Sequence, residues 1–341
     1  MLPAGVDSFT GIHPFLLVFT AAGLDWLVGD PRWCLHPVVA MGWCISRLRQ
    51  LAEHCCADHP WALRLAGGLI TLVLVGGSGA SGWLLEQGSQ RLPPPLGFAV
   101  LVVGLASALA GRSLEQAVRG VLRALPNLER ARSALSWIVG RDTATLDAPD
   151  ILRAAAETAS ENAVDGLFAP LFWMLIGADL WSGGFSEAPG PLALAWGFKA
   201  ASTLDSMMGY REGRLRWLGT AGARLDDLLV WLPCRLVALS LPLVSRATLP
   251  RALDLLRQSL RDGAPDPSPN AGVSQAIYAH CQGVQLGGRN RYGAAWREKP
   301  LLAAGAAAVS AASVEGMLQR TQRLELLWLI TASSISAAIH R

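Results

Sequence analysis

Three carboxylates stand at helical spacing in the segment 141–170, RDTATLDAPDILRAAAETASENAVDGLFAP. Glu157, Glu161 and Asp165 follow one another at i, i+4 and i+8, which places them on one face of an α-helix. No Lys or Arg is interleaved with them, and like charges at this spacing destabilise a helix by roughly 0.2–0.5 kcal/mol per pair. The pattern therefore indicates that a cation lies against this face, either a bound metal ion or basic groups from elsewhere in the fold.

The start of this helix can be read from the residues that precede the carboxylates. Asp147 is a favoured N-cap residue, and Pro149 and Asp150 are favoured in a first helical turn. At the other end, Asp165 precedes the apolar run 167–181, where a carboxylate that enters lipid costs roughly 2.5–3.5 kcal/mol. We therefore expect a helix that begins after Asp147 and carries its acidic face towards an apolar segment.

A second group of charged residues lies between positions 199 and 235. Carboxylates with basic neighbours suit Mg²⁺ together with phosphate, because Mg²⁺ prefers oxygen ligands and basic groups bind the anion. The alternative is that these charges only mark the ends of helices at a membrane interface. The group consists of Lys199, Asp205, Arg224, Asp226, Asp227 and Arg235.

A third candidate is the turn SPNAG at 268–272. Ser268 and Asn270 present a hydroxyl and an amide next to backbone N–H groups at a helix start, where an anion can bind. A simple N-cap explains the same residues equally well.

Composition indicates the class of protein. The 341 residues are 52% hydrophobic and 16% charged, with a mean hydropathy of +0.34. Soluble domains have about 25% charged residues, so the chain is predicted to be an integral membrane protein. The formal charge of +3 is too small to favour nucleic acid as a partner.

Apolar segments define the elements that must position these residues. They lie at 14–28, 65–85, 96–110, 162–181, 190–204, 228–244 and 324–339. The segment 228–244 contains Pro233 and Pro242, so we expect it to be broken or re-entrant. The glycines of the segment 65–85 formally match GxGxxG, and close helix packing is the better interpretation because no strand precedes them.

The distribution of basic residues predicts the topology. Lys and Arg concentrate in the polar regions at about 112–160, 205–227 and 246–323, which the positive-inside rule places in the cytoplasm. Within the first of them, apolar residues recur at helical spacing from Leu114 to Leu125, which predicts an amphipathic helix. We therefore expect one all-α, multi-pass domain over residues 1–341, with several transmembrane helices and large helical cytoplasmic regions.

Several long motifs occur in order along the chain. The chain resembles the CobD/CbiB family of cobalamin-biosynthesis membrane proteins, the adenosylcobinamide-phosphate synthases. The motifs that carry the resemblance are DWLVGDP with HPV at 25–38, ARSALSWIVGRDT at 131–143, ETASENAVDGLFAPLFW at 157–173, KAASTLDSMMGY at 199–210, ARLDDLLVWLPCRL at 223–236, SPNAGVSQA at 268–276 and GVQLGG at 283–288.

The resemblance implies an ATP-dependent acid–amine ligase. It would join adenosylcobyric acid to (R)-1-amino-2-propanol phosphate, or to ethanolamine phosphate, and give adenosylcobinamide phosphate. Mg²⁺ and ATP would be required, because a carboxylate must be activated before an amine can attack it. The implied location is the inner (cytoplasmic) membrane with the site facing the cytoplasm. The partners are the bilayer, the corrinoid and amine substrates, and other membrane enzymes of late cobalamin assembly.

Residue roles follow as hypotheses. The catalytic set is Glu157, Glu161, Asp165 and Asp227, and the metal set is Asp205, Asp226 and Glu161. Residues expected to bind substrate or phosphate are Arg141, Asp142, Asn162, Lys199, Arg224, Arg235, Ser268 and Asn270.

Two other classes of function fit parts of the sequence. A transporter can line its pathway with intramembrane charges such as Asp165 and Lys199. A non-catalytic relative can bind a corrinoid or act as a scaffold in a membrane complex. The charged cytoplasmic regions and the SPNAG turn favour the enzyme, because a transporter keeps its specific residues near the midplane.

Overall fold

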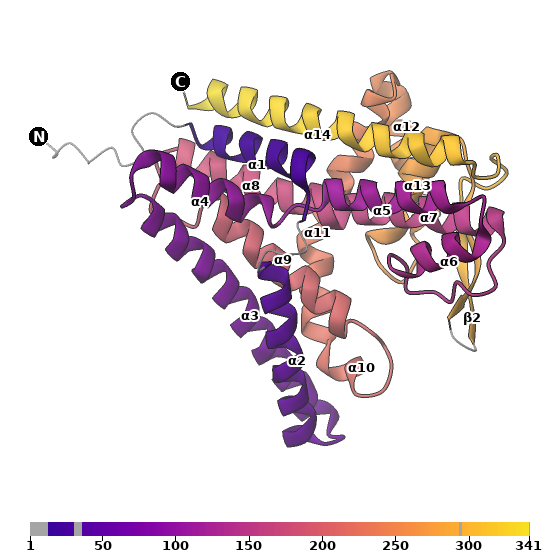
Figure 1. The fold of residues 1–341 in the computed structure, drawn as a ribbon, viewed down its shortest axis with the longest axis horizontal. Helices are drawn as coiled ribbons and strands as arrows, with labels where there is room; N and C mark the ends of the chain where they lie inside the picture. Colours follow the sequence, from indigo (N-terminus) through magenta and orange to yellow (C-terminus); the bar gives the residue numbers. More distant parts are fainter. Residues whose placement is uncertain (1–12, 31–35, 293–294, 341) are drawn as a thin grey trace, which may run out of the picture. The chain divides into compact units, whose positions relative to one another are not determined.

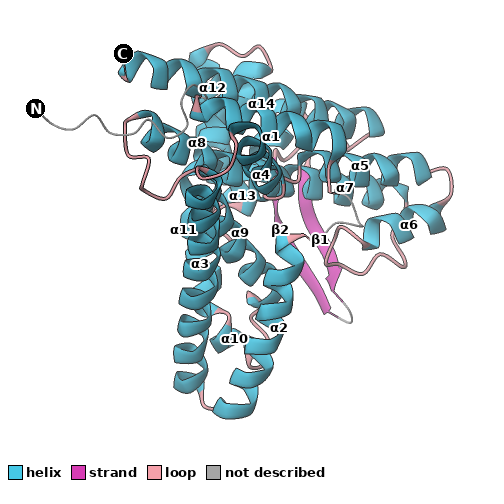
Figure 2. Ribbon diagram, turned by 60° about the vertical axis from the view of Figure 1, so that its left-hand side comes forward, coloured by secondary structure: helices cyan, strands magenta, loops and turns pink. Residues whose placement is uncertain are grey.

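The computed structural model describes residues 13–30, 36–292 and 295–340; residues 31–35, within the first motif of the resemblance, lie outside these ranges. The described chain is mostly helical, with one two-stranded sheet (Figures 1 and 2). The helices are α1 (Pro14–Val28), α2 (Pro37–Cys56), α3 (Pro60–Ser89), α4 (Pro94–Ala106), α5 (Gly111–Ala124), α6 (Leu128–Ser136), α7 (Ala148–Ala163), a π-helix (Val164–Phe168), α8 (Ala169–Ser182), α9 (Pro191–Met208), α10 (Leu215–Leu218), α11 (Thr220–Val244), α12 (Leu249–Gly263), α13 (Ala271–Gln282) and α14 (Ala311–Ile339). The strands are β1 (Leu286–Tyr292) and β2 (Ala295–Leu302).

The chain forms two compact units. The first unit comprises the described residues of Met1–Ala110, Pro170–Asp226 and Leu329–Arg341, and the second comprises Gly111–Ala169 and Asp227–Trp328. Each unit draws on separate stretches of sequence, so no single cut in the chain separates them.

Close packing of α3 against α9 organises the first unit (Figure 1). Gly82 makes this approach possible, because a Cβ at this position would lie 2.8 Å from the Cα of Ala193. The packing interpretation of the glycines in α3 is therefore confirmed at Gly82. Leu63 and Leu74 of α3 are buried in the same hydrophobic cluster as Leu204 of α9.

A buried carboxylate caps α9 within the first unit. The side chain of Glu86 on α3 accepts hydrogen bonds from the backbone N–H groups of Gly190 (3.0 Å), Leu192 (2.7 Å) and Ala193 (3.2 Å). The first N–H groups of a helix have no partner within the helix, and a negative charge there is favourable. Glu86 therefore fixes the start of α9.

The second unit packs α5, α6 and α7 around one hydrophobic cluster. Val121 of α5, Leu135 of α6 and Ile151 of α7 are fully buried in it. Val118 of α5 is also buried, so the predicted amphipathic helix is confirmed. This cluster holds α7 in place from one side.

The strands β1 and β2 form an antiparallel hairpin, which the sequence analysis did not predict (Figure 2). The hairpin packs against α7, α12 and α13. A bulge interrupts its register between Leu286 and Gly288, and Gly287 and Gly288 have φ angles of +83° and +88°. Such φ angles favour glycine, and the bulge turns the backbone of β1 towards α7.

Within the described part of the chain, three helices are long and apolar enough to cross a membrane. They are Pro60–Ser89, Ala148–Ser182 and Thr220–Val244, and a fourth span results if Pro94–Ala106 and Gly111–Ala124 count as one bent span. The expected break in the segment 228–244 is wrong, because α11 continues through Pro233 and Pro242 to Val244. The architecture is that of an all-α integral membrane protein with one small hairpin.

Candidate functional site

The N-terminus of α7 is formed as predicted. Asp147 is the N-cap, and its Oδ1 accepts a hydrogen bond from the backbone N–H of Asp150 at 2.9 Å. Glu157 and Glu161 then follow one turn apart, with a rise of about 6 Å between them. The cap and the buried side of α7 fix the positions from which these carboxylates extend.

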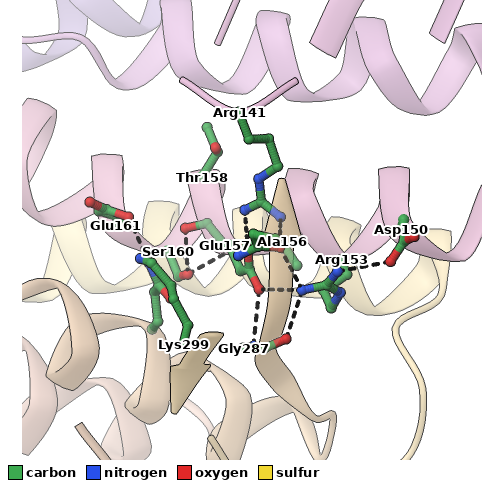
Figure 3. Close-up of polar contacts among 12 residues, drawn as sticks. Arg141, Asp150, Arg153, Ala156, Glu157, Thr158, Ser160, Glu161, Gly287 and Lys299 are labelled. Carbon is green, nitrogen blue, oxygen red and sulfur yellow. Dashed lines mark hydrogen bonds and ion pairs between the residues drawn. The ribbon is translucent and has the colours of Figure 1, made fainter. Parts of the chain in front are cut away.

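Glu157 is the centre of a buried ionic network (Figure 3). Its side chain is 3% exposed and forms an ion pair with Arg141, whose side chain is 7% exposed. Arg153 approaches the same carboxylate at 3.4 Å, and the backbone N–H of Gly287 donates to it at 3.0 Å. The cation expected beside Glu157 is thus supplied by two arginines.

Asn290 of β1 ties the two arginines together. Its Oδ1 accepts hydrogen bonds from Arg141 Nη1 at 2.7 Å and from Arg153 Nη1 at 3.0 Å. Arg153 also donates to the carbonyl of Gly287 at 2.7 Å and to Asp150 at 2.8 Å. The network fixes the hairpin against α7.

Glu161 has different surroundings. Gln275 Nε2 on α13 donates to Glu161 Oε2 at 2.6 Å. Figure 3 shows Lys299 of β2 beside Glu161, and the Lys299 ammonium lies 3.6 Å from Asp266. Glu161 keeps intermediate exposure, whereas Glu157 is buried. Of the two glutamates on α7, Glu161 is therefore the less buried.

The predicted turn before α13 is present. Ser268 Oγ accepts hydrogen bonds from the backbone N–H groups of Asn270 (3.2 Å) and Ala271 (3.3 Å). Asn270 Nδ2 donates to the Asp227 carbonyl at 2.8 Å, and Arg235 donates to the Pro269 carbonyl at 2.6 Å. Asp227, Arg235, Ser268 and Asn270 therefore form one cluster, and the side chain of Asn270, the N-cap residue of α13, makes no capping hydrogen bond.

The remaining predicted residues of the second unit lie around these two groups. Asp142 donates its backbone N–H to the Arg291 carbonyl at 3.0 Å, and Asn162 is exposed at the end of α7. Asp165 lies in the π-helix, where the α-helical spacing that relates Glu157 to Glu161 no longer applies. Glu157 and Glu161 lie on consecutive turns of α7 as predicted, and Asp165 follows them in the π-helix.

Four predicted residues belong to the first unit. Lys199 and Asp205 lie on α9, and Arg224 and Asp226 lie on α11. Within this unit, Gly222 of α11 packs closely against Leu204, the residue before Asp205. The structure thus brings most of the predicted site together in the second unit and places these four residues in the other.

The described residues build no metal cage. They contain no group of three or more His, Cys, Asp or Glu side chains that could hold a metal ion. Mg²⁺ does not need such a cage, since it usually binds through one or two carboxylates together with substrate phosphates. The donor set therefore fits Mg²⁺ that arrives with a nucleotide, and does not fit a resident structural ion.

Several residues of the site were not predicted. Arg153 stands four residues before Glu157, and this spacing alone could have identified it as the partner. Gln275 and Asn290 carry no local signal, because their contacts depend on how α13 and β1 pack against α7.

Comparisons with known proteins bear on the family. The model of the family described as "CobD/Cbib protein" matches residues 18–321. The chain is 38% identical over 333 residues to "Cobalamin biosynthesis protein CobD" of Synechocystis sp., covering 96% of this chain and 94% of that protein. It is 40% identical over 278 residues to the protein of the same name from Geobacter metallireducens, covering 81% and 82%. It is 36% identical over 318 residues to "Cobalamin biosynthesis protein CbiB" of Salmonella typhimurium, covering 93% of each.

No solved structure matches the chain. By the family model and by these relatives, the chain belongs to the CobD/CbiB family.

Proposed function

We propose that this protein joins a carboxyl group of adenosylcobyric acid to the amine of (R)-1-amino-2-propanol phosphate, or of ethanolamine phosphate, with consumption of ATP. Membership of the CobD/CbiB family supports a role in cobalamin biosynthesis. The observation that carries the proposal is the pair of carboxylates on one turn of α7. Glu157 is neutralised and rigid, while Glu161 is less buried and bonded to a neutral amide.

The two carboxylates suit different tasks in amide formation. An amine attacks only after losing a proton, so a base must lie close to the reacting nitrogen. We assign this role to Glu161, because its partner Gln275 is a neutral amide, whereas the hydrogen bonds of Glu157 are taken up by Arg141, Arg153 and Gly287. In this proposal Glu157 holds the hairpin, and Glu161 acts on the substrate.

ATP supplies the activation of the carboxylate, and Mg²⁺ would accompany its phosphates. Arg235, Ser268 and Asn270 are proposed to contact a phosphate or a corrin amide, and Asp227 holds their turn. Arg141, Asp142, Asn162 and Asp165 remain predicted contributors from the second unit. Lys199, Asp205, Arg224 and Asp226 remain predictions in the first.

The test uses purified protein in detergent with adenosylcobyric acid, Mg·ATP and either amino-alcohol phosphate. Mass spectrometry should detect the amide product with at least one of the amines. Glu161→Ala should abolish product formation, whereas Glu129→Ala, an exposed carboxylate on α6, should leave it unchanged. Absence of a corrinoid product with both amines, or normal turnover of Glu161→Ala, would contradict the proposal.

We further propose that the protein resides in the inner membrane with this site facing the cytoplasm. The basic residues of the regions 112–160 and 246–323 support this orientation. An impermeant thiol reagent should label an engineered cysteine at Glu129 in inverted membrane vesicles and not in right-side-out vesicles. Equal labelling in both preparations would rule the orientation out.

A further inference from the structure

Gln275 contains a buried acceptor with no partner. The residue is 1% exposed, and its Oε1 has no hydrogen-bond partner among the described residues. Its Nε2 is engaged by Glu161 at 2.6 Å, so the vacant acceptor belongs to an amide that is already oriented towards the carboxylate. Leaving a buried amide oxygen without a donor is costly, and native proteins satisfy such atoms with protein, water or ligand donors.

The charges around this amide favour a cation. Lys299 lies beside Glu161, and its ammonium is 3.6 Å from the carboxylate of Asp266. Glu157 is balanced by its own arginines. The carboxylate of Glu161 has a neutral hydrogen-bond partner in Gln275, so a cation that binds at this amide would lie beside a carboxylate. A ligand that carries one positive charge and N–H donors would complement both this carboxylate and the vacant oxygen.

We propose that Glu161 and Gln275 bind the ammonium group of the amino-alcohol phosphate, with Gln275 Oε1 accepting one of its N–H bonds. This inference rests on the proposed function and names the part of the substrate that the pair takes. An ammonium fits better than Mg²⁺, because Mg²⁺ demands near-octahedral oxygen coordination and the amide already turns its nitrogen towards Glu161. Gln275 is then a specificity-determining residue for the amine.

The pair also accounts for the protons in the reaction. Glu161 removes one proton from the ammonium, and the free amine attacks the carbonyl carbon of the acyl phosphate formed from the corrinoid carboxylate and ATP. The new C–N bond forms as the C–O bond to phosphate breaks. The second proton of the attacking nitrogen leaves with the inorganic phosphate. Gln275 Oε1 holds the nitrogen during these steps and undergoes no chemistry itself.

The decisive variant is Gln275→Met, which removes the acceptor with little change in volume. We expect its KM for the amino-alcohol phosphate to rise at least tenfold, while its KM values for Mg·ATP and for the corrinoid stay within twofold of wild type. Gln275→Glu restores an acceptor and should bring the KM for the amine back towards wild type. Ser274→Ala is the matched control, because Ser274 is the buried neighbour of Gln275 and its hydroxyl donates to the carbonyl of Ala271 within α13.

A binding measurement separates this inference from the proposed function. Calorimetry should show that Gln275→Met binds (R)-1-amino-2-propanol phosphate at least tenfold more weakly than wild type does. Its affinity for propanediol phosphate, which has a hydroxyl in place of the ammonium, should not change. This comparison needs no turnover, so it decides the inference even if the corrinoid product is never formed.

Two results would overturn the inference. If wild type is active and Gln275→Met keeps the wild-type KM and affinity for the amine, the buried oxygen is served by ordered water only, and the proposed function stands without it. If Gln275→Met instead raises the Mg²⁺ concentration needed for half-maximal activity and leaves the amine unaffected, the pair holds a metal ion. Variants that elute as monodisperse peaks in size-exclusion chromatography are the ones compared.

Discussion

Arg141 and Asn290 are separated by 149 positions, and their side chains meet beside the carboxylate of Glu157, with Arg141 Nη1 2.7 Å from Asn290 Oδ1. Arg141 precedes α7 and Asn290 lies on β1, so one hydrogen bond joins the approach to α7 to the hairpin. Arg141 also pairs with Glu157, and Asn290 also accepts a hydrogen bond from Arg153, the second arginine beside Glu157. The buried carboxylate is the element on which this part of the second unit depends.

Replacing Glu157 with Ala should destabilise the protein strongly. The change leaves two guanidinium groups close together in a buried site without their counter-ion, and loss of one partner of a buried ion pair costs about 3–5 kcal/mol. Thermal unfolding of the detergent-solubilised protein measures the effect. Asp150→Asn is the control, because Asp150 pairs with the same Arg153 but its side chain is 44% exposed. Loss of the exposed Asp150–Arg153 ion pair should lower the free energy of unfolding by less than about 1 kcal/mol. Equal decreases in stability for Glu157→Ala and Asp150→Asn would contradict this account.

Two adjacent glycines of β1 should respond differently to alanine. A Cβ at Gly287 would lie 1.9 Å from the carbonyl oxygen of Pro300, whereas at Gly288 the nearest atom is 3.6 Å away, on the side chain of Leu301. Both have positive φ angles, so both variants carry similar backbone strain. Gly287→Ala should in addition force the strands apart and withdraw an N–H group from Glu157. We therefore expect a clearly lower unfolding temperature for Gly287→Ala than for Gly288→Ala; the reverse order would show that the close contact with Pro300 is absent.

Glu86 provides a test within the first unit. Glu86→Ala removes the acceptor of three N–H groups at the start of α9, and buried groups left without a partner cost about 1–3 kcal/mol each. Thermal unfolding should register this loss. Glu187→Ala is a suitable comparison, because this exposed glutamate offers its backbone carbonyl, and not its carboxylate, to Trp83. If both variants unfold at the same temperature as the wild type, Glu86 does not cap α9.

The Arg119–Glu315 pair predicts an effect of pH on stability. The hydrogen bond from Arg119 holds the pKa of the Glu315 carboxyl below its ordinary value of 4.5. A carboxyl whose pKa is lower in the folded state adds stability above its ordinary pKa, and this contribution disappears as the pH falls through the lowered value. Between pH 6 and pH 3, the unfolding temperature of Glu315→Gln should therefore fall less than that of the wild type. The plot of unfolding temperature against pH for Glu129→Gln, at an exposed site, should follow that of the wild type. If the plot for Glu315→Gln runs parallel to that of the wild type, the Arg119–Glu315 pair does not contribute to the pH dependence of stability.

Local features of the fold were predictable from the sequence. The cap at Asp147 and the bounds of α1 depend on residues that are neighbours in the chain, and the structure confirms the cap. The hairpin was missed because β1, LGGRNRY, has no β-branched residue and no apolar alternation, which are the usual signals of a strand. Packing against α7 and α13 forms this strand, and local preference does not.

The candidate site shows the same limit. Sequence spacing identified the acidic residues of α7, but the groups that distinguish Glu157 from Glu161 come from distant segments. Asn290, Gln275 and Lys299 have the same residue types as many surface side chains, and only the tertiary fold gives them their partners.

The π-helix Val164–Phe168 separates two registers along one helical rod. A π-turn amounts to one extra residue within an α-helix, so deletion of a single residue there would convert it to ordinary α-helix. Because the wide turn takes up the extra residue, this deletion would leave the side chains on either side of it in their present orientation about the helix axis, whereas a deletion within α7 would turn every later side chain by about 100°. The wide turn is therefore the place in this helix where a change in length by one residue alters the directions of the side chains least.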